Sequence, residues 1–178
     1  MTRHVDPLLD ELLAPWRELI GADFDGYRHH CQRMLTFCQA LHDCSELDRQ
    51  KLAIAACFHD IGLWTANTLD YLPPSIAAAL ACLRQRGDEQ WREEIALMIG
   101  EHHKLRPVRD ARYPLVEVFR RADLVDFSLG LRRCGLDARL IKDVRAELPN
   151  AGFHRMLLRR AGAWLIRHPL RPAPMMKW

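Results

Sequence analysis

Apolar side chains recur along most of the chain at the three- and four-residue spacing of a buried helical face. Residues 6–20 follow this spacing, and Pro15 is expected to bend or split the segment. The same pattern covers residues 27–42, 89–104, 115–128, 137–148 and 152–167. No stretch shows the strict alternation of a half-buried strand. The pattern predicts an all-α fold, a helical bundle of about seven helices in one domain spanning residues 1–178.

Capping signals place a further helix directly before an adjacent His-Asp pair. Ser45 and Asp48 resemble a capping box, which predicts a helix start at this point. The apolar residues that follow carry the helix into His59 and Asp60. Gly62 is expected to end it, because glycine commonly follows the last turn of a helix. Only near such an end can two adjacent side chains reach one point.

The remaining segments are predicted from prolines and glycines. Residues 63–74 are expected to form a loop, after which Ser75 caps a helix that ends before Gly87. The linker 105–114 is rich in Arg and Pro. The domain core is expected over about 24–130, with C-terminal helices over 137–167 and a basic, proline-containing tail over 168–178.

Composition narrows the class of protein. The 178 residues carry a net charge of +3, from 26 basic and 23 acidic residues, which is too balanced to indicate a nucleic-acid partner. No apolar run approaches the roughly 20 residues of a membrane span. Acidic residues stand where a signal peptide needs an apolar stretch, so a cytoplasmic location is expected. The six cysteines form no C-x-x-C pair, which argues against a structural zinc site.

Four residues in three predicted helices suggest a metal site. His30 lies within one helix, His59 and Asp60 close a second, and Asp123 lies within a third, in the segment RRADLVDF. Two imidazoles and two carboxylates suit a divalent ion such as Mn, Fe, Co, Ni or Zn, with Mg also open. Such a set leaves positions for water and for substrate oxygens. Asp60 is the predicted catalytic residue, since it would position the attacking water.

The order H…HD…D, with the pair inside AACFHDIG, resembles the HD-domain superfamily of metal-dependent phosphohydrolases. The resemblance covers roughly residues 24–130 and implies that His30, His59, Asp60 and Asp123 bind the metal. Members tend to carry Arg three residues after the first His. His30 with Arg33 fits that spacing, whereas His29 does not, so His30 is assigned.

His102 and His103 decide how many ions are expected, one or two. In two-metal branches of the superfamily, histidines between HD and the last Asp hold the second ion, and the HD aspartate bridges. His102 and His103 could act in this way. Alternatively, one of them binds substrate phosphate or caps the helix C-terminus. The Lys of the common HDIGK form is replaced by Leu63.

Candidate substrate-binding residues surround these ligands. Arg33, Trp64 and Asp126 are predicted to contact substrate, with Trp64 as a pocket wall. Asp126 could instead pair with Arg120 or Arg121. Lys104 is predicted to bind substrate and to protonate the departing group, and Arg106 and Arg109 could also clamp phosphate.

These features predict a metal-dependent hydrolase, acting on a small, anionic, phosphorylated or nucleotide-like molecule. Two alternatives stay open: a di-iron oxygenase or zinc-type hydratase, and a non-catalytic module that binds nucleotide and metal. No membrane or nucleic-acid partner is expected. The sequence leaves a monomer and a homodimer open.

Overall fold

The computed structural model describes residues 6–176, so residues 1–5 and 177–178 of the predicted domain and tail lie outside the described residues. The described part is helical and contains no β-strand, which confirms the predicted all-α fold. The helices are α1 (Pro7–Leu13), α2 (Arg17–Ile20), α3 (Phe24–Leu41), α4 (Glu46–Phe58), α5 (Gly62–Thr65), α6 (Leu72–Arg86), α7 (Arg92–Glu101), α8 (Pro114–Phe127), α9 (Ala138–Glu147) and α10 (Phe153–Arg167).

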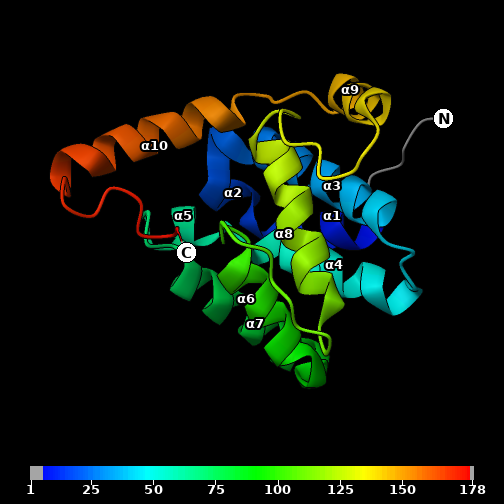
Figure 1. Ribbon diagram of the computed structural model, residues 1–178. Helices are drawn as coiled ribbons and strands as arrows, with labels where there is room; N and C mark the ends of the chain where they lie inside the picture. Colours follow the sequence, from blue (N-terminus) through cyan, green and yellow to red (C-terminus); the bar gives the residue numbers. More distant parts are fainter. Residues whose placement is uncertain (1–5, 177–178) are drawn as a thin grey trace.

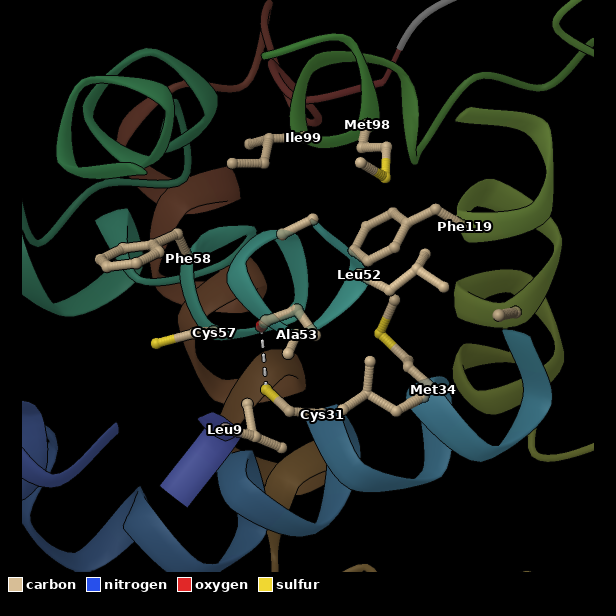
Figure 2. Packing of buried hydrophobic residues seen from close by; sticks show 14 of the residues in the cluster. Leu9, Cys31, Met34, Leu52, Ala53, Cys57, Phe58, Met98, Ile99 and Phe119 are labelled. Atoms are coloured by element: carbon tan, nitrogen blue, oxygen red, sulfur yellow. Dashed lines mark hydrogen bonds between the residues drawn. The ribbon is translucent and has the colours of Figure 1, made fainter. Parts of the chain in front are cut away.

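Helix α4 runs from the edge of the molecule into the bundle, behind α8 in Figure 1. Its predicted capping box is present, with the Ser45 side chain accepting from the Asp48 amide. Every residue from Leu52 to Phe58 is buried, because α1, α3, α6, α7 and α8 all pack around this helix. Figure 2 shows Phe119 of α8 pointing toward Leu52. A helix buried on all sides fixes the direction of the side chains that follow it.

The start of α6 differs from the prediction. The helix begins at Leu72, and Pro73 and Pro74 lie in its first turn. Proline is tolerated there, since first-turn amides have no partner within the helix. Ser75 is therefore not the cap; its hydroxyl accepts a hydrogen bond from the Gly62 amide at 3.0 Å. The predicted loop 63–74 also contains the short helix α5.

Gly62 has a different role from the predicted helix end. Helix α4 stops at Phe58, three turn residues follow, and Gly62 is the first residue of α5. A Cβ atom at this position would lie 2.4 Å from the Tyr71 carbonyl oxygen and 2.9 Å from Pro74 Cγ. Glycine is thus required because α5 packs directly against the start of α6.

Helix α10 extends along the outside of the bundle (orange in Figure 1). Arg160 anchors it through a hydrogen bond from Nη1 to the Leu63 carbonyl oxygen, at 2.8 Å. The following segment turns back: Trp164 Nε1 donates to the Arg171 carbonyl oxygen, and the Arg171 guanidinium pairs with Asp70 at 3.3 Å. Met175 then packs against the core.

Within residues 6–176, no helix has both the length and the apolar character needed to cross a bilayer.

Candidate metal centre

Three of the predicted ligands meet in the interior of the protein. His30 comes from α3, while His59 and Asp60 lie in the turn that follows α4. Their exposed fractions are 1%, 0% and 4%. His59 Nε2 lies 3.0 Å from His30 Nε2 and 3.4 Å from Asp60 Oδ2. These three residues form a group whose ligand atoms could share one metal ion.

Asp123 on α8 completes the predicted set of four. Its Oδ1 atom lies 3.6 Å from His30 Nε2, and its side chain is buried. Three helical segments separated by up to 93 residues therefore bring two imidazoles and two carboxylates together. This convergence is the geometry that the sequence predicted for a divalent metal.

In His30 and His59, a hydrogen bond at Nδ1 fixes which ring nitrogen carries the proton. His30 Nδ1 donates to Asp126 at 2.7 Å, and His59 Nδ1 donates to the Ala56 carbonyl oxygen at 2.8 Å. Both acceptors lack hydrogen, so each neutral ring keeps a lone pair at Nε2. These lone pairs face each other across 3.0 Å, which is repulsive without a cation between them. Two ligands about 2.1 Å from one ion, at a right angle, would stand about 3.0 Å apart.

A second group is formed by Asp60, His102 and His103. His102 Nδ1 donates to the Ile99 carbonyl oxygen at 2.7 Å, which leaves Nε2 facing Asp60 Oδ1 at 3.6 Å. Both of these facing atoms are buried and have no hydrogen-bond partner among the described residues. His103 Nδ1 lies 3.7 Å from Asp123 Oδ2. The residues thus fit a second ion, with Asp60 shared between the two groups.

Burial keeps two of the histidines in the form that binds metal. It lowers the pKa of His59 to about 3, and it lowers the pKa of His103 well below its usual value. Burial alone would also lower the pKa of His102, but the facing Asp60 carboxylate outweighs it and raises that pKa. A proton on His102 relieves the contact between two acceptors, so a metal ion binding there must displace it.

The carboxyl groups of Asp60 and Asp123 differ in their pKa values. Burial raises the pKa of Asp60, but the neighbouring His59 and His102 outweigh this effect and hold it below the usual range, so Asp60 is ionised. Burial raises the pKa of Asp123 to about 6. Asp60 is therefore ready to bridge two cations, whereas Asp123 loses its proton only near neutral pH.

Arg33 and Asp126, predicted as substrate contacts, lie behind His30 and not in the cavity. Arg33 donates from Nε and Nη2 to Asp126 at 2.5 and 2.7 Å, and from Nη1 to the Leu148 carbonyl oxygen at 2.9 Å. Neither Arg120 nor Arg121 is the partner of Asp126, contrary to the simpler prediction. The pair orients His30 by holding the acceptor of its Nδ1 proton.

Lys104 and Trp64 also lie elsewhere than predicted. Lys104 follows α7, and its Nζ pairs with Glu101, the last residue of that helix, at 3.1 Å. Trp64 packs on Tyr27, with ring centroids 4.8 Å apart, and its Nε1 donates to Asp23. Neither residue lines the cavity over the ligand cluster. The choice of His30 fits the geometry, because His29 is directed to the Pro149 carbonyl oxygen.

Two tyrosines support the cluster, and neither is among the predicted site residues. The Tyr27 hydroxyl donates to the Cys57 carbonyl oxygen at 2.8 Å and accepts from the Asp60 amide, so it braces the His-Asp turn. The Tyr71 hydroxyl lies 2.5 Å from His103 Nε2. Tyr27 stands three residues before His30, one turn earlier on α3, and that spacing is the signal that could have identified it.

A cavity of about 290 Å³ opens over the ligand cluster. His30, Asp60, His103 and Asp123 form its floor, beside Tyr71. Apolar side chains and one histidine form the rest of its lining: Leu69, Phe127, Leu129, Phe153, His154, Leu157, Leu158, Ala161, Met175 and Met176. A larger hollow of about 390 Å³ lies between α1 and α6, but it touches none of the ligand groups.

Comparison with protein-family models matches the HD domain over residues 27–128. This region contains every residue of the two ligand groups and ends before α9. No match was found among curated proteins or among solved structures.

Proposed function

The chain belongs to the HD-domain family, which is of metal-dependent phosphohydrolase type, and on that premise we propose that it is a two-metal hydrolase that releases phosphate from a small ester. The observation that carries this proposal is the pair of buried ligand groups sharing Asp60. In the first group, His30 Nε2 and His59 Nε2 face one another at 3.0 Å, and in the second, His102 Nε2 and Asp60 Oδ1 face one another at 3.6 Å without a hydrogen-bond partner among the described residues. Such contacts are stable when cations separate them.

Divalent ions held there would supply a water of lowered pKa and would polarise a phosphoryl oxygen. The protein's own contribution is orientation. Asp60 directs one carboxylate oxygen to each group, and Asp126 and the Ala56 carbonyl fix the rings of His30 and His59. The surrounding core excludes bulk water, so fixed charges act more strongly on a bound substrate.

Tyr71 replaces Lys104 as the candidate proton donor. Burial raises the pKa of the Tyr71 hydroxyl well above its usual value, so it keeps its proton. If His103 binds metal through Nδ1, its Nε2 carries the ring proton and donates it to the tyrosine oxygen. The hydroxyl hydrogen is then free to turn toward an oxygen of the substrate in the cavity, which Tyr71 lines.

The test is phosphate release in ¹⁸O-labelled water by protein purified and loaded with Mn²⁺ without oxygen. Attack of water on phosphorus places one labelled oxygen in the released phosphate. Asp60→Asn is expected to lose this activity, because both ligand groups lose a carboxylate charge. Asp143→Asn, a substitution of an exposed aspartate on α9, is the matched control and should keep it. Normal turnover by Asp60→Asn at full metal content would refute the proposal.

A second candidate function is a di-iron oxygenase. It requires a complete second ligand set, and the approach of both His102 and His103 to the Asp60–Asp123 pair favours it. Iron-loaded protein that consumes O₂ with an organic substrate, and releases no labelled phosphate from any ester, would support this candidate over the hydrolase.

A further inference from the structure

The cavity is built from two parts of the chain with different chemistry. Its floor lies within residues 27–128, which match the HD domain, and carries the ligands. Most of its apolar wall comes from α10 and the segment after it, outside the matched region; Leu157, Ala161 and Met175 are examples. Most of the apolar wall of the cavity therefore lies outside the region that matches the HD domain.

No arginine or lysine lines this cavity among residues 6–176. Three cations from the segments around the site have partners elsewhere. Arg33 pairs with Asp126, Lys104 with Glu101, and Arg160 donates to the Leu63 carbonyl oxygen. A chain of phosphates beyond the metal ligands would find no positive partner on the wall.

The size of the cavity limits the apolar group. An apolar cavity of about 150 Å³ holds one benzene molecule, so the observed 290 Å³ has room for on the order of a dozen non-hydrogen atoms. A nucleoside is larger than this and carries sugar hydroxyls. Each hydroxyl buried against Leu157 or Phe127 without a partner would weaken binding roughly tenfold.

We propose, on the basis of the hydrolase function above, that the substrate is a phosphate monoester of a compact apolar alcohol. The alcohol's hydrocarbon part lies against α10 and Met175, and its phosphate lies at the ligand cluster. In the reaction a water oxygen forms a bond to phosphorus while the bond from phosphorus to the ester oxygen breaks. The alcohol oxygen gains the proton of the Tyr71 hydroxyl, the attacking water returns a proton to Tyr71, and the products are the alcohol and inorganic phosphate.

The first test compares kcat/KM of the Mn²⁺-loaded protein for alkyl phosphates from ethyl to octyl, glycerol phosphate and adenosine monophosphate. Each added methylene should raise kcat/KM about fourfold until the cavity is filled. Glycerol phosphate and adenosine monophosphate should be poor substrates. Equal or better turnover of either polar ester than of hexyl phosphate would overturn the proposal.

Two variants of α10 test where the apolar group binds: one changes a residue that lines the cavity, and the other changes an exposed residue. Ala161→Leu fills part of the cavity and should lower the ratio of kcat/KM for hexyl over ethyl phosphate at least tenfold. Ala163→Leu adds the same side chain at an exposed position on the same helix and should leave that ratio at the wild-type value. An unchanged ratio in Ala161→Leu would contradict the proposed location.

Binding of hexanol to the metal-loaded protein, measured by calorimetry, separates the two proposals. Phosphate release that is fastest from adenosine monophosphate leaves the hydrolase standing and refutes the apolar substrate. Absence of phosphate release from every ester, with hexanol binding that Ala161→Leu abolishes, refutes the hydrolase and retains the apolar binding site. Absence of hexanol binding to wild-type protein counts against the apolar site directly.

Discussion

The buried ion pair behind His30 gives the sharpest prediction. Arg33 and Asp126 have side chains only 2% and 1% exposed, so solvent does not screen their charges. Asp126 also accepts the Nδ1 proton of His30 at 2.7 Å. Substituting Asp126 with Ala removes that acceptor and leaves the Arg33 charge buried without its carboxylate. One substitution thus affects both protein stability and the orientation of a metal ligand.

The two effects have separate magnitudes. Breaking a buried pair by removing one partner lowers the free energy of unfolding by about 3–5 kcal/mol. Loss of a residue that orients a ligand weakens metal binding about 10- to 100-fold. The double variant Arg33→Met/Asp126→Leu removes both charges and should recover part of the stability. Recovery stays incomplete, because the carbonyl oxygens of Leu148 and Pro149 lose a donor, at about 1 kcal/mol each.

Urea unfolding of the metal-free variants measures stability, and competition with a chelator measures metal affinity. The double variant should be more stable than Asp126→Ala and yet bind metal just as weakly. Wild-type metal affinity in the double variant would refute the idea that Asp126 orients His30. Unchanged stability in Asp126→Ala would refute the buried-charge reasoning.

Three further predictions concern the competition of protons with metal at Asp123, the packing around Gly62, and the contact of Tyr71 to the second ligand group. Burial raises the pKa of Asp123 to about 6, so the metal-induced rise in Tm should be full at pH 7.5 and shrink as pH falls through 6; equal rises at pH 7.5 and 5 would contradict this. Gly62→Ala should lower the free energy of unfolding by about 1–3 kcal/mol, since its Cβ meets the Tyr71 carbonyl. Gly162→Ala on α10, with open space around its Cβ, should be neutral or slightly stabilising in the same urea titration. Tyr71→Phe should weaken the second ion about 10- to 100-fold in a chelator titration and spare the first; equal weakening of both would exclude a specific contact to His103.

The sequence signals for the floor of the site are mostly local. The capping box at Ser45 defines a helix that leads to His59 and Asp60, and the family resemblance, through Arg33 three residues later, selects His30 over His29. Helix periodicity likewise predicts which faces are buried. These features depend on residues a few positions apart, which is the range over which sequence patterns carry structural information.

Contacts between distant segments were not predictable in the same way. The partner of Asp126 is Arg33, 93 residues earlier, although Arg120 and Arg121 are its neighbours in sequence. The return of α10 and Met175 over the cavity depends on anchors such as Arg160, which no local pattern marks. Long-range pairing of this kind is set by how whole helices pack, and the sequence states only that those helices exist.

The position of Tyr71 could be predicted only in part, because it depends on a local signal that has two interpretations. From the sequence alone, Tyr71 lies in the loop after the His-Asp pair, where it could face the site or could equally belong to a turn before Pro73 and Pro74. The structure resolves this, because the prolines begin α6 and place Tyr71 at its N-cap, beside His103. Because the first turn of α6 was predicted as the end of a loop, the sequence did not identify Tyr71 as a residue of the candidate site.

The central claim is that two ions share Asp60, and metal content measures it most directly. Protein reconstituted with Mn²⁺ or Fe²⁺ without oxygen, then desalted, should hold two ions per chain. His102→Ala should hold one, because only the second group loses a ligand, and Asp60→Ala should hold none. One ion per chain in the wild-type protein, or two ions in Asp60→Ala, would contradict the account.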